Sequence, residues 1–282
     1  MAIPPLQLPS WLSRHLLVAT HPDQLAPTEL MRIRQGLSRF RSEGAKASIV
    51  IPAYNEGANI IRTLSSLAEL VLPDEVVVEL LVVDDASTDS TPDWLHALGV
   101  HHIRLPENSS PKEARRLGLE ACHGEIVLQA DADSVYPAQW GKRYLEVLEH
   151  EGVSIVYGGH SFLPDPRAGR LALATHEALG NVARSLRRRH REHINVHGFN
   201  SAFWRGQGLQ YGSYDHDPLG SEDGHMALKL SKVGQLRYCP GTNCKVWTSP
   251  RRLLAKGGLA GGSIRRIKKE VRRMGEYLTG RS

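Results

Sequence analysis

Two carboxylates lie two residues apart in Asp131-Ala132-Asp133, directly after an apolar segment. Carboxylate oxygens suit Mg²⁺ or Mn²⁺, and such an ion also takes phosphate oxygens and water as ligands. A cation at this point would neutralise a departing nucleoside diphosphate. Taken alone, the same pattern is equally typical of a turn in which Asp133 is a cap and Asp131 is solvated.

A second acidic turn runs from Asp84 to Asp89. The carboxylate of Asp85 can accept hydrogen bonds from a pyrimidine ring or from ribose hydroxyls. Asp89 or Ser90 is better suited to cap the helix that follows. We therefore interpret Asp85 as a binding residue and Asp89 as a structural one.

A third turn, Pro52-Ala53-Tyr54-Asn55-Glu56, follows the first apolar strand. Tyr54 offers a ring face to a base, and Glu56 offers an acceptor. Asn55 or Glu56 satisfying the amides of a helix start explains the same residues about as well. Further along, Glu222-Asp223 begins a helix, where Asp223 is either a capping acid or a general base for an acceptor hydroxyl.

The elements that position these turns alternate along the first half of the chain. We expect strands at 47–51, 75–83, 101–105 and 125–130, and helices at 59–70, 92–98 and 112–122. This alternation predicts a mostly parallel sheet with right-handed crossovers. Ligands bind outside the carboxyl ends of such strands, so the three turns should open onto one crevice.

The second half is less regular. We expect helices at 139–150, 170–189 and 222–233, and strands at 153–158, 194–204 and 235–238. In helix 170–189 the side chains of Leu171, Thr175, Ala178, Val182 and Leu186 are in register on one face.

The segment from His197 to Trp204 precedes the proposed base and should line the acceptor side. His197 and Asn200 are candidates to bind hydroxyls there. Trp204 is either a stacking platform for a sugar or part of the core.

Two basic segments lie near the carboxyl end. Arg251 and Arg252, before a Gly-rich stretch, either close over donor phosphates or form a solvated linker. Residues 263–278 predict a helix with one apolar face, which either contacts an anionic membrane or packs on its own domain. The run 187–191 is a solvated surface or a site for an acidic acceptor.

Composition sets the frame for these segments. The chain has 282 residues, 41% of them hydrophobic, which suffices for one α/β domain with short appendages. A net charge of +5 suits an anionic partner. We find no 18-residue apolar run and no signal peptide, and we interpret Cys122, Cys239 and Cys244 as ordinary thiols, which favours the cytoplasm.

We divide the chain into an N-terminal helical extension (1–45), a nucleotide-sugar-binding half (46–135), an acceptor-binding half (136–250) and a basic tail (251–282).

The motifs together resemble family 2 glycosyltransferases with the GT-A fold, over roughly residues 47–245. The segments that carry the resemblance are 49–56, 82–89, 130–133 and 222–223. It implies inverting transfer from a nucleoside-diphosphate sugar, with Asp133 binding the metal, Asp131 supporting the sugar or ribose, and Asp223 as the base. Arg116 departs from the family, which usually has Asn after the arginine that corresponds to Arg115.

The full expectation is therefore a metal-dependent enzyme with a UDP- or GDP-sugar donor and a hydroxyl-bearing acceptor, which is a sugar, a small molecule or a lipid-linked group. The predicted donor-binding residues are Pro52, Ala53, Tyr54, Glu56, Asp85, Arg115, Asp131, Ala132, Arg251 and Arg252. The predicted acceptor-binding residues are His197, Asn200, Trp204 and Glu222. The alternatives are a nucleotidyltransferase that makes activated sugars and a non-catalytic carbohydrate- or nucleic-acid-binding module. For the leading hypothesis, a glycosyltransferase, we expect no nucleic-acid partner. The sequence does not indicate an oligomeric state.

Overall fold

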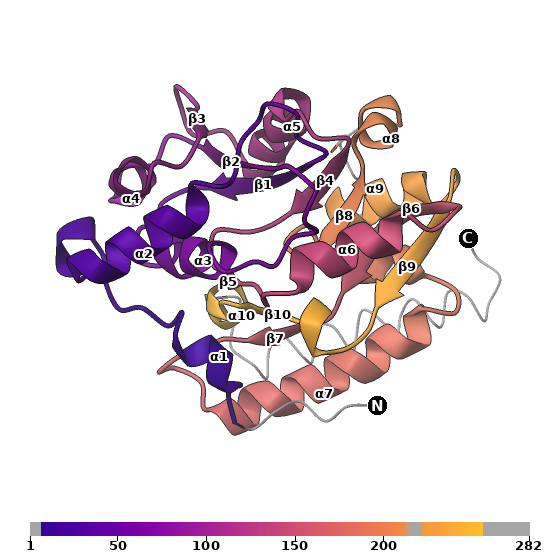
Figure 1. Ribbon diagram of the computed structural model, residues 1–282. Helices are drawn as coiled ribbons and strands as arrows, with labels where there is room; N and C mark the ends of the chain where they lie inside the picture. Colours follow the sequence, from indigo (N-terminus) through magenta and orange to yellow (C-terminus); the bar gives the residue numbers. More distant parts are fainter. Residues whose placement is uncertain (1–6, 212–213, 215–221, 256–282) are drawn as a thin grey trace.

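The computed structural model describes residues 7–211, 214 and 222–255. Within them, a seven-stranded sheet has the order β3-β2-β1-β4-β8-β6-β9, and a small sheet has the order β5-β10-β7 (Figure 1). The strands of the large sheet are β1 (Ala47–Ala53), β2 (Val78–Asp84), β3 (His102–Arg104), β4 (Ile126–Gln129), β6 (Val153–Gly158), β8 (Ser201–Trp204) and β9 (Gln235–Cys239). The small sheet contains β5 (Ser134–Val135), β7 (His160–Phe162) and β10 (Val246–Thr248).

Helices pack around these sheets. The α-helices are α1 (Ser10–Ser13), α2 (Pro27–Leu37), α3 (Ile60–Leu67), α4 (Thr91–Leu98), α5 (Pro111–Ala121), α6 (Trp140–Leu148), α7 (Arg170–Arg187), α8 (Arg205–Gln210), α9 (Glu222–Leu230) and α10 (Arg251–Ala255). Three short 3₁₀ turns are η1 (Pro22–Gln24), η2 (Glu192–Asn195) and η3 (Thr242–Cys244). Among the described residues, no helix is long and apolar enough to cross a membrane.

The predicted α/β fold with a mostly parallel sheet is confirmed. Strands β3, β2, β1 and β4 are parallel, and β8 alone runs antiparallel to its neighbours β4 and β6 within this sheet. Because β1 and β2 are buried on both faces, they are nearly continuous apolar runs.

Alternation along the strands divides the core in two. Ile49 and Ile51 belong to a cluster that also holds residues of α3, α4 and α6. Val50, between them, belongs to a second cluster with residues of α5 and α9. Side chains alternate across a strand, so helices cover both faces of the sheet. Helix α5 approaches closely because Gly118 has no Cβ, which would lie 2.4 Å from Val50 Cγ1.

The N-terminal segment contributes two α-helices, α1 and α2, and the 3₁₀ turn η1. Helix α2 starts at Pro27 after Ala26, and no side chain caps it. Ile33 and Leu37 of α2 are buried in the first cluster. The segment is therefore part of the main core.

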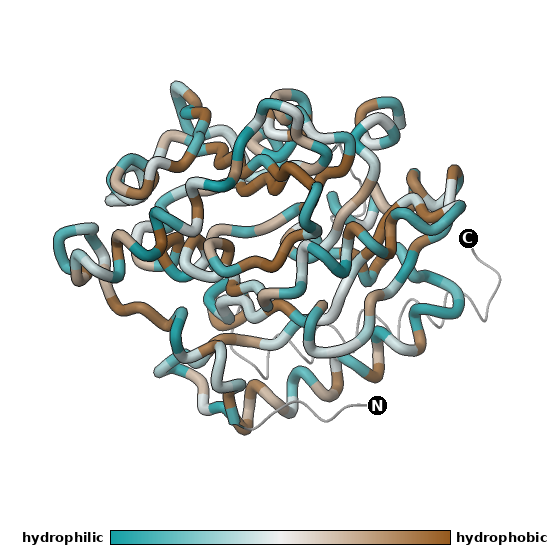
Figure 2. The backbone as a smooth tube through the Cα atoms, in the orientation of Figure 1, coloured by the Kyte–Doolittle hydropathy of each residue, from teal (hydrophilic) through white to brown (hydrophobic). Residues whose placement is uncertain are grey.

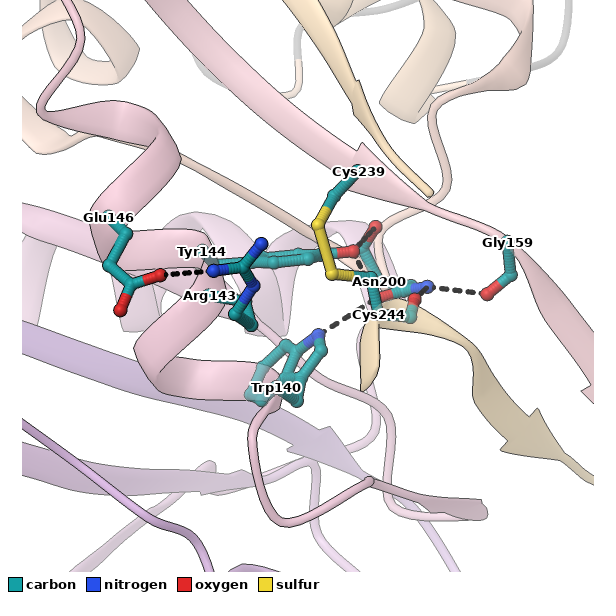
Figure 3. Close-up of a disulfide and its surroundings, with 8 residues drawn as sticks. All are labelled: Trp140, Arg143, Tyr144, Glu146, Gly159, Asn200, Cys239 and Cys244. Atoms are coloured by element: carbon teal, nitrogen blue, oxygen red, sulfur yellow. Dashed lines mark hydrogen bonds and ion pairs between the residues drawn. A yellow bond between two sulfur atoms is a disulfide. The ribbon is translucent and has the colours of Figure 1, made fainter. Parts of the chain in front are cut away.

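Two expectations for the second half are wrong. The strand expected at 194–204 is only Ser201–Trp204, because the residues before it form η2 and a turn. Cys239 and Cys244 are also not separate thiols, since the structure joins them in a disulfide (Figure 3). The turn at Gly241, with a φ of 95°, brings the two Cα atoms to 5.9 Å. Only Cys122 is a free cysteine, so cysteine usage no longer argues for a reducing compartment.

Candidate active site

One pocket opens at the carboxyl ends of β1, β2 and β4, where the parallel topology predicts it. Its lining holds the ten predicted donor-binding residues together with Asp133 and, in addition, Pro111 and Ala114 of α5. The lining residues are Pro52, Ala53, Tyr54, Glu56, Asp85, Pro111, Ala114, Arg115, Asp131, Ala132, Asp133, Arg251 and Arg252. The hydrogen bonds, burial and charges of these side chains decide what the pocket can bind.

The turns after β1 and β2 are locked together by Asn55. Its backbone has a φ of 51°, in the left-handed region that Asn tolerates better than most residues. Its side-chain oxygen accepts a hydrogen bond from the amide of Thr88 at 2.8 Å. The Glu56 amide donates to Thr91 Oγ1 at 2.8 Å. This cross-linking leaves the ring of Tyr54 exposed at the pocket while the side chain of Glu56 is buried.

The two adjacent acids after β2 have different surroundings. Asp84 is fully buried and pairs with Arg104, so it is structural. Asp85 lines the pocket, and its Oδ1 accepts from the amide and the hydroxyl of Ser109, each at 2.8 Å. The loop before α5 therefore holds Asp85 in place, and Asp89 accepts from the amide of Thr91 at the start of α4.

Arg115 joins the two halves of the molecule. It donates to Asp131 Oδ1 at 2.5 Å and lies 3.7 Å from Asp223 Oδ1. Burial opposes the charge of this guanidinium, but the carboxylates of Asp131 and Asp223 raise the pKa of Arg115 above its usual range. The side chain of Asp223 is 21% exposed, and its Oδ1 has no hydrogen bond in the described structure.

The absence of a side chain at Gly198 allows the Arg115 guanidinium and the Asp223 carboxylate to lie this close together. A Cβ at this position would lie 2.4 Å from Asp223 Oδ1 and 2.9 Å from Arg115 Cζ. Because real Cβ atoms do not approach so closely, any side chain here would displace Asp223 or Arg115. In the sequence this glycine falls within the strand expected at 194–204, and no pattern there marks its role.

Asp133 is buried among other acids. Its Oδ2 lies 3.4 Å from Arg251 Nη2, and the same guanidinium also pairs with Glu56. Burial, together with the charges of Asp131 and Glu56, raises the pKa of Asp133 to about 7. Strand β10 holds the neighbouring backbone, since the Ser249 amide donates to the Asp133 carbonyl oxygen at 3.1 Å. The site therefore collects negative charge that Arg115, Arg251 and Arg252 partly offset.

Tyr136 is a positioning residue that the sequence did not reveal. Its hydroxyl accepts from the Asp131 amide at 2.9 Å and donates to the Phe199 carbonyl oxygen at 3.0 Å. It thus ties the Asp131 turn to the segment that contains Gly198. No pattern in the sequence marks this bond, because its partners are 5 and 63 residues away.

The predicted acceptor residues do not form one surface. His197 stacks on Phe199, with 6° between the ring planes, and its ring lies 5.3 Å from that of His160. Glu222 precedes Asp223 on α9, and burial raises the pKa of its carboxyl group.

Asn200 and Trp204 are not placed as expected. The Asn200 side chain is 1% exposed and hydrogen-bonds to Trp140, Tyr144 and two backbone carbonyls (Figure 3). Trp204 pairs with Ile126, at the end of β4 remote from Asp131, and its Nε1 donates to the Val153 carbonyl oxygen. Both side chains therefore serve the fold, and we withdraw them as acceptor ligands.

The sequence profile described as Glycosyl transferase family 2 matches residues 48–206, more than half of the chain. Glycosyltransferase AglE of Haloferax volcanii is 30% identical over 130 residues, which cover 44% of this chain and 42% of AglE. Glucosyl-3-phosphoglycerate synthase of Mycobacterium tuberculosis is 33% identical over 136 residues, which cover 44% of this chain and 41% of the synthase. The match thus spans less than half the length of these relatives.

Solved structures agree on the fold. S. aureus TarS, residues 1–349, superposes with a TM-score of 0.55 and 18% identity, covering 74% of this chain and 62% of that one. Mannosyltransferase PcManGT of Pyrobaculum calidifontis, solved with GDP-Man and Mn²⁺, gives a TM-score of 0.54 at 21% identity and covers 86% of this chain and 71% of that one. The fold is that of these glycosyltransferase structures. The chain belongs to glycosyl transferase family 2.

Proposed function

We propose that this enzyme transfers a sugar from a UDP- or GDP-sugar to a hydroxyl group, with inversion and with the help of a divalent cation. The observation that carries the proposal is the single pocket in which the turns after β1, β2 and β4 meet. TarS has been solved with UDP-GlcNAc and PcManGT with GDP-Man, so proteins of this fold bind such donors.

Donor binding is assigned to the pocket wall. Tyr54 is exposed there and offers its ring to the nucleotide base, and Asp85 is held where a carboxylate can accept from the base or ribose. Arg251 and Arg252 line the same pocket and supply positive charge for the diphosphate. Arg251 now binds Glu56 and Asp133, so donor phosphates would compete for its guanidinium.

The residues present fit Mg²⁺ or Mn²⁺. No group of three or more His, Cys, Asp or Glu within the described residues is arranged to hold a metal by itself. Mg²⁺ is commonly held by one or two carboxylates together with substrate phosphates and water, which needs no such cage. Asp133 would be the protein ligand; burial and the charges of Asp131 and Glu56 raise its pKa to about 7, so a cation would offset the negative charge gathered around it. A cation bound there would stabilise the leaving diphosphate.

Asp223 is proposed as the general base. Its carboxylate lies beside Arg115, which also holds Asp131, so one arginine orients the acid of the donor side and the acid of the acceptor side. An acceptor hydroxyl that donates its proton to Asp223 would attack the anomeric carbon from the face opposite the phosphate. A single displacement of that kind inverts the anomeric centre.

The acceptor is assigned less fully. His197 and Glu222 stay as proposed contacts because both adjoin the Gly198–Asp223 meeting point in sequence. The sugar, the nucleotide and the acceptor's identity need direct screening. A cytoplasmic location is also a proposal, and the membrane contact expected of 263–278 lies outside the described residues.

A thermal-shift screen tests the donor assignment. UDP, GDP and their sugars are added at ten times their Kd, with Mn²⁺, with Mg²⁺ or with a chelator. One nucleotide should raise the Tm by about 3–5 °C with metal, which corresponds to about 1.4 kcal/mol of binding linkage. Absence of any shift with every nucleotide would contradict the proposal.

Variants test whether the ligand that raises the Tm binds in the pocket. Asp133→Asn should remove the metal-dependent part of the shift. Asp165→Asn, whose carboxylate pairs with Arg167 and does not line the pocket, is the matched control and should keep it. Stabilisation only by a nucleoside triphosphate together with a sugar phosphate would favour the nucleotidyltransferase alternative.

A further inference from the structure

Helix α7 carries large apolar side chains on its outer surface. Leu171, Leu179, Val182 and Leu186 are 69%, 56%, 41% and 66% exposed. They fall within about 80° of the helix circumference at 3.6 residues per turn. These four residues are called the α7 stripe below, and apolar segments along α7 are visible in Figure 2. The apolar face predicted from the sequence thus exists, but it points away from the core.

Polar groups hold the inner face of α7 beside the buried Leu173 and Ala174. Glu177 is buried, accepts from the Phe162 amide at 2.8 Å and pairs with Arg170. Arg184 is also buried, and its carbonyl oxygen accepts from Asn195 Nδ2 at 2.9 Å. A surface helix ordinarily buries its apolar side and exposes its charges. Because buried groups on the inner face of α7 hold it in place, the exposed stripe is not needed to attach the helix.

The exposed charge at the end of the stripe is positive. Residues 170–191 contain six arginines and one acidic residue, Glu177; Glu177 and Arg184 are buried, and Arg170 pairs with Glu177. Arg189 and His190 follow the end of the helix and are exposed. A solvent-facing apolar stripe with basic residues and no exposed acid on the same helix is the pattern of helices that lie on anionic lipid.

Two other candidates to cover the stripe are residues 256–282 and a second copy of the chain, and each would bring positive charge to a positive surface. Residues 256–282 continue from α10, whose Leu253 and Leu254 pack against Leu173 at the start of α7. That segment holds eight lysines and arginines against two glutamates, so it would bring positive charge to a positive surface. A second copy of the chain, meeting α7 with α7, would do the same.

We propose that the α7 stripe docks on an anionic phospholipid bilayer. The leucines and Val182 enter the boundary between headgroups and acyl chains, and the exposed Arg189 and His190 after the helix lie among lipid phosphates. This contact is separate from the donor pocket, so it stands whether or not the proposed transfer reaction is correct.

Vesicle flotation of the full chain tests the proposal. Vesicles of phosphatidylcholine with about 30% phosphatidylglycerol should carry the protein at low salt, and phosphatidylcholine alone should carry little. Leu186→Asp should weaken binding about tenfold. Met31→Asp is the matched control, since Met31 on α2 is 69% exposed, and it should bind like the wild type. Equal binding of Leu186→Asp and wild type would overturn the proposal and assign any binding to another segment.

A fluorescent label identifies what covers the stripe. Cys122 is buried and the other two cysteines are paired, so Leu179→Cys provides an accessible thiol for an environment-sensitive dye. The dye emission should shift to the blue only when anionic vesicles are added. Emission already blue-shifted without lipid, and unchanged by vesicles, would show that residues 256–282 or a second copy covers the stripe. That result, or no shift with either vesicle, would overturn the proposal.

Discussion

The proposed donor half (46–135) and the proposed acceptor half (136–250) place their residues in different ways. In the donor half, the pocket is made by turns directly after β1, β2 and β4, so position in the sequence and position at the pocket correspond. In the acceptor half, β8 runs antiparallel, and Asn200 at one end of it is buried while Trp204 lies at the end remote from the site. Parallel topology fixes which end of a strand faces the ligand, whereas an antiparallel neighbour does not.

The largest effect should come from Asp223. Asp223→Asn should reduce turnover about 10²–10⁴-fold, the usual contribution of a general base, while donor binding is retained. Turnover is measured as nucleoside diphosphate released from the sugar donor that gives the largest thermal shift, with water as the acceptor when none is supplied. An unimpaired rate would remove Asp223 as the base.

The second-largest effect should come from Gly198, because this residue lies where Arg115 and Asp223 approach each other. Gly198→Ala adds a Cβ 2.4 Å from Asp223 Oδ1, so the carboxylate must move and turnover should fall about 10²-fold with the fold intact. Gly206→Ala is the matched control, since a Cβ there meets nothing within 4 Å. If both variants kept full rates, the close approach of Asp223 to Gly198 would have no catalytic role.

The sequence predicted which turns meet at the pocket, for a physical reason. Apolar runs identify buried strands, and polar residues at their ends must face the crevice because the connections are short. Tyr136 and Gly198 escaped prediction, since they act through contacts with residues far along the chain. Helix α7 shows the same limit, because periodicity located its apolar face and could not reveal that Glu177 anchors the opposite one.

Asn200 should affect stability more than chemistry. Asn200→Ala leaves the Trp140 indole N–H and the Tyr144 hydroxyl without their partner and opens a small cavity, which should lower the free energy of unfolding by about 2–3 kcal/mol. Asn243→Ala, at an exposed position, should change it by less than about 0.5 kcal/mol. Denaturant unfolding measures both. A stable Asn200→Ala variant with poor turnover would return Asn200 to the acceptor site.

Trp204 should show the smallest effect. Trp204→Phe keeps most of the ring and loses the hydrogen bond to the Val153 carbonyl oxygen. The free energy of unfolding should therefore fall by about 1 kcal/mol. Turnover well below the Tm should be unchanged. A loss of rate at full stability would contradict the position of Trp204 at the far end of the sheet.

The central claim is that the strand-end pocket holds a cation and a nucleoside diphosphate together. A crystal grown with Mn²⁺ and the nucleotide that shifts the Tm most, with data collected at the manganese edge, tests it directly. We predict an anomalous peak within coordination distance of an Asp133 carboxylate oxygen and beside the diphosphate, with Arg251 moved from Glu56 onto a phosphate. A peak elsewhere, or a nucleotide bound away from Tyr54 and Asp85, would contradict the account.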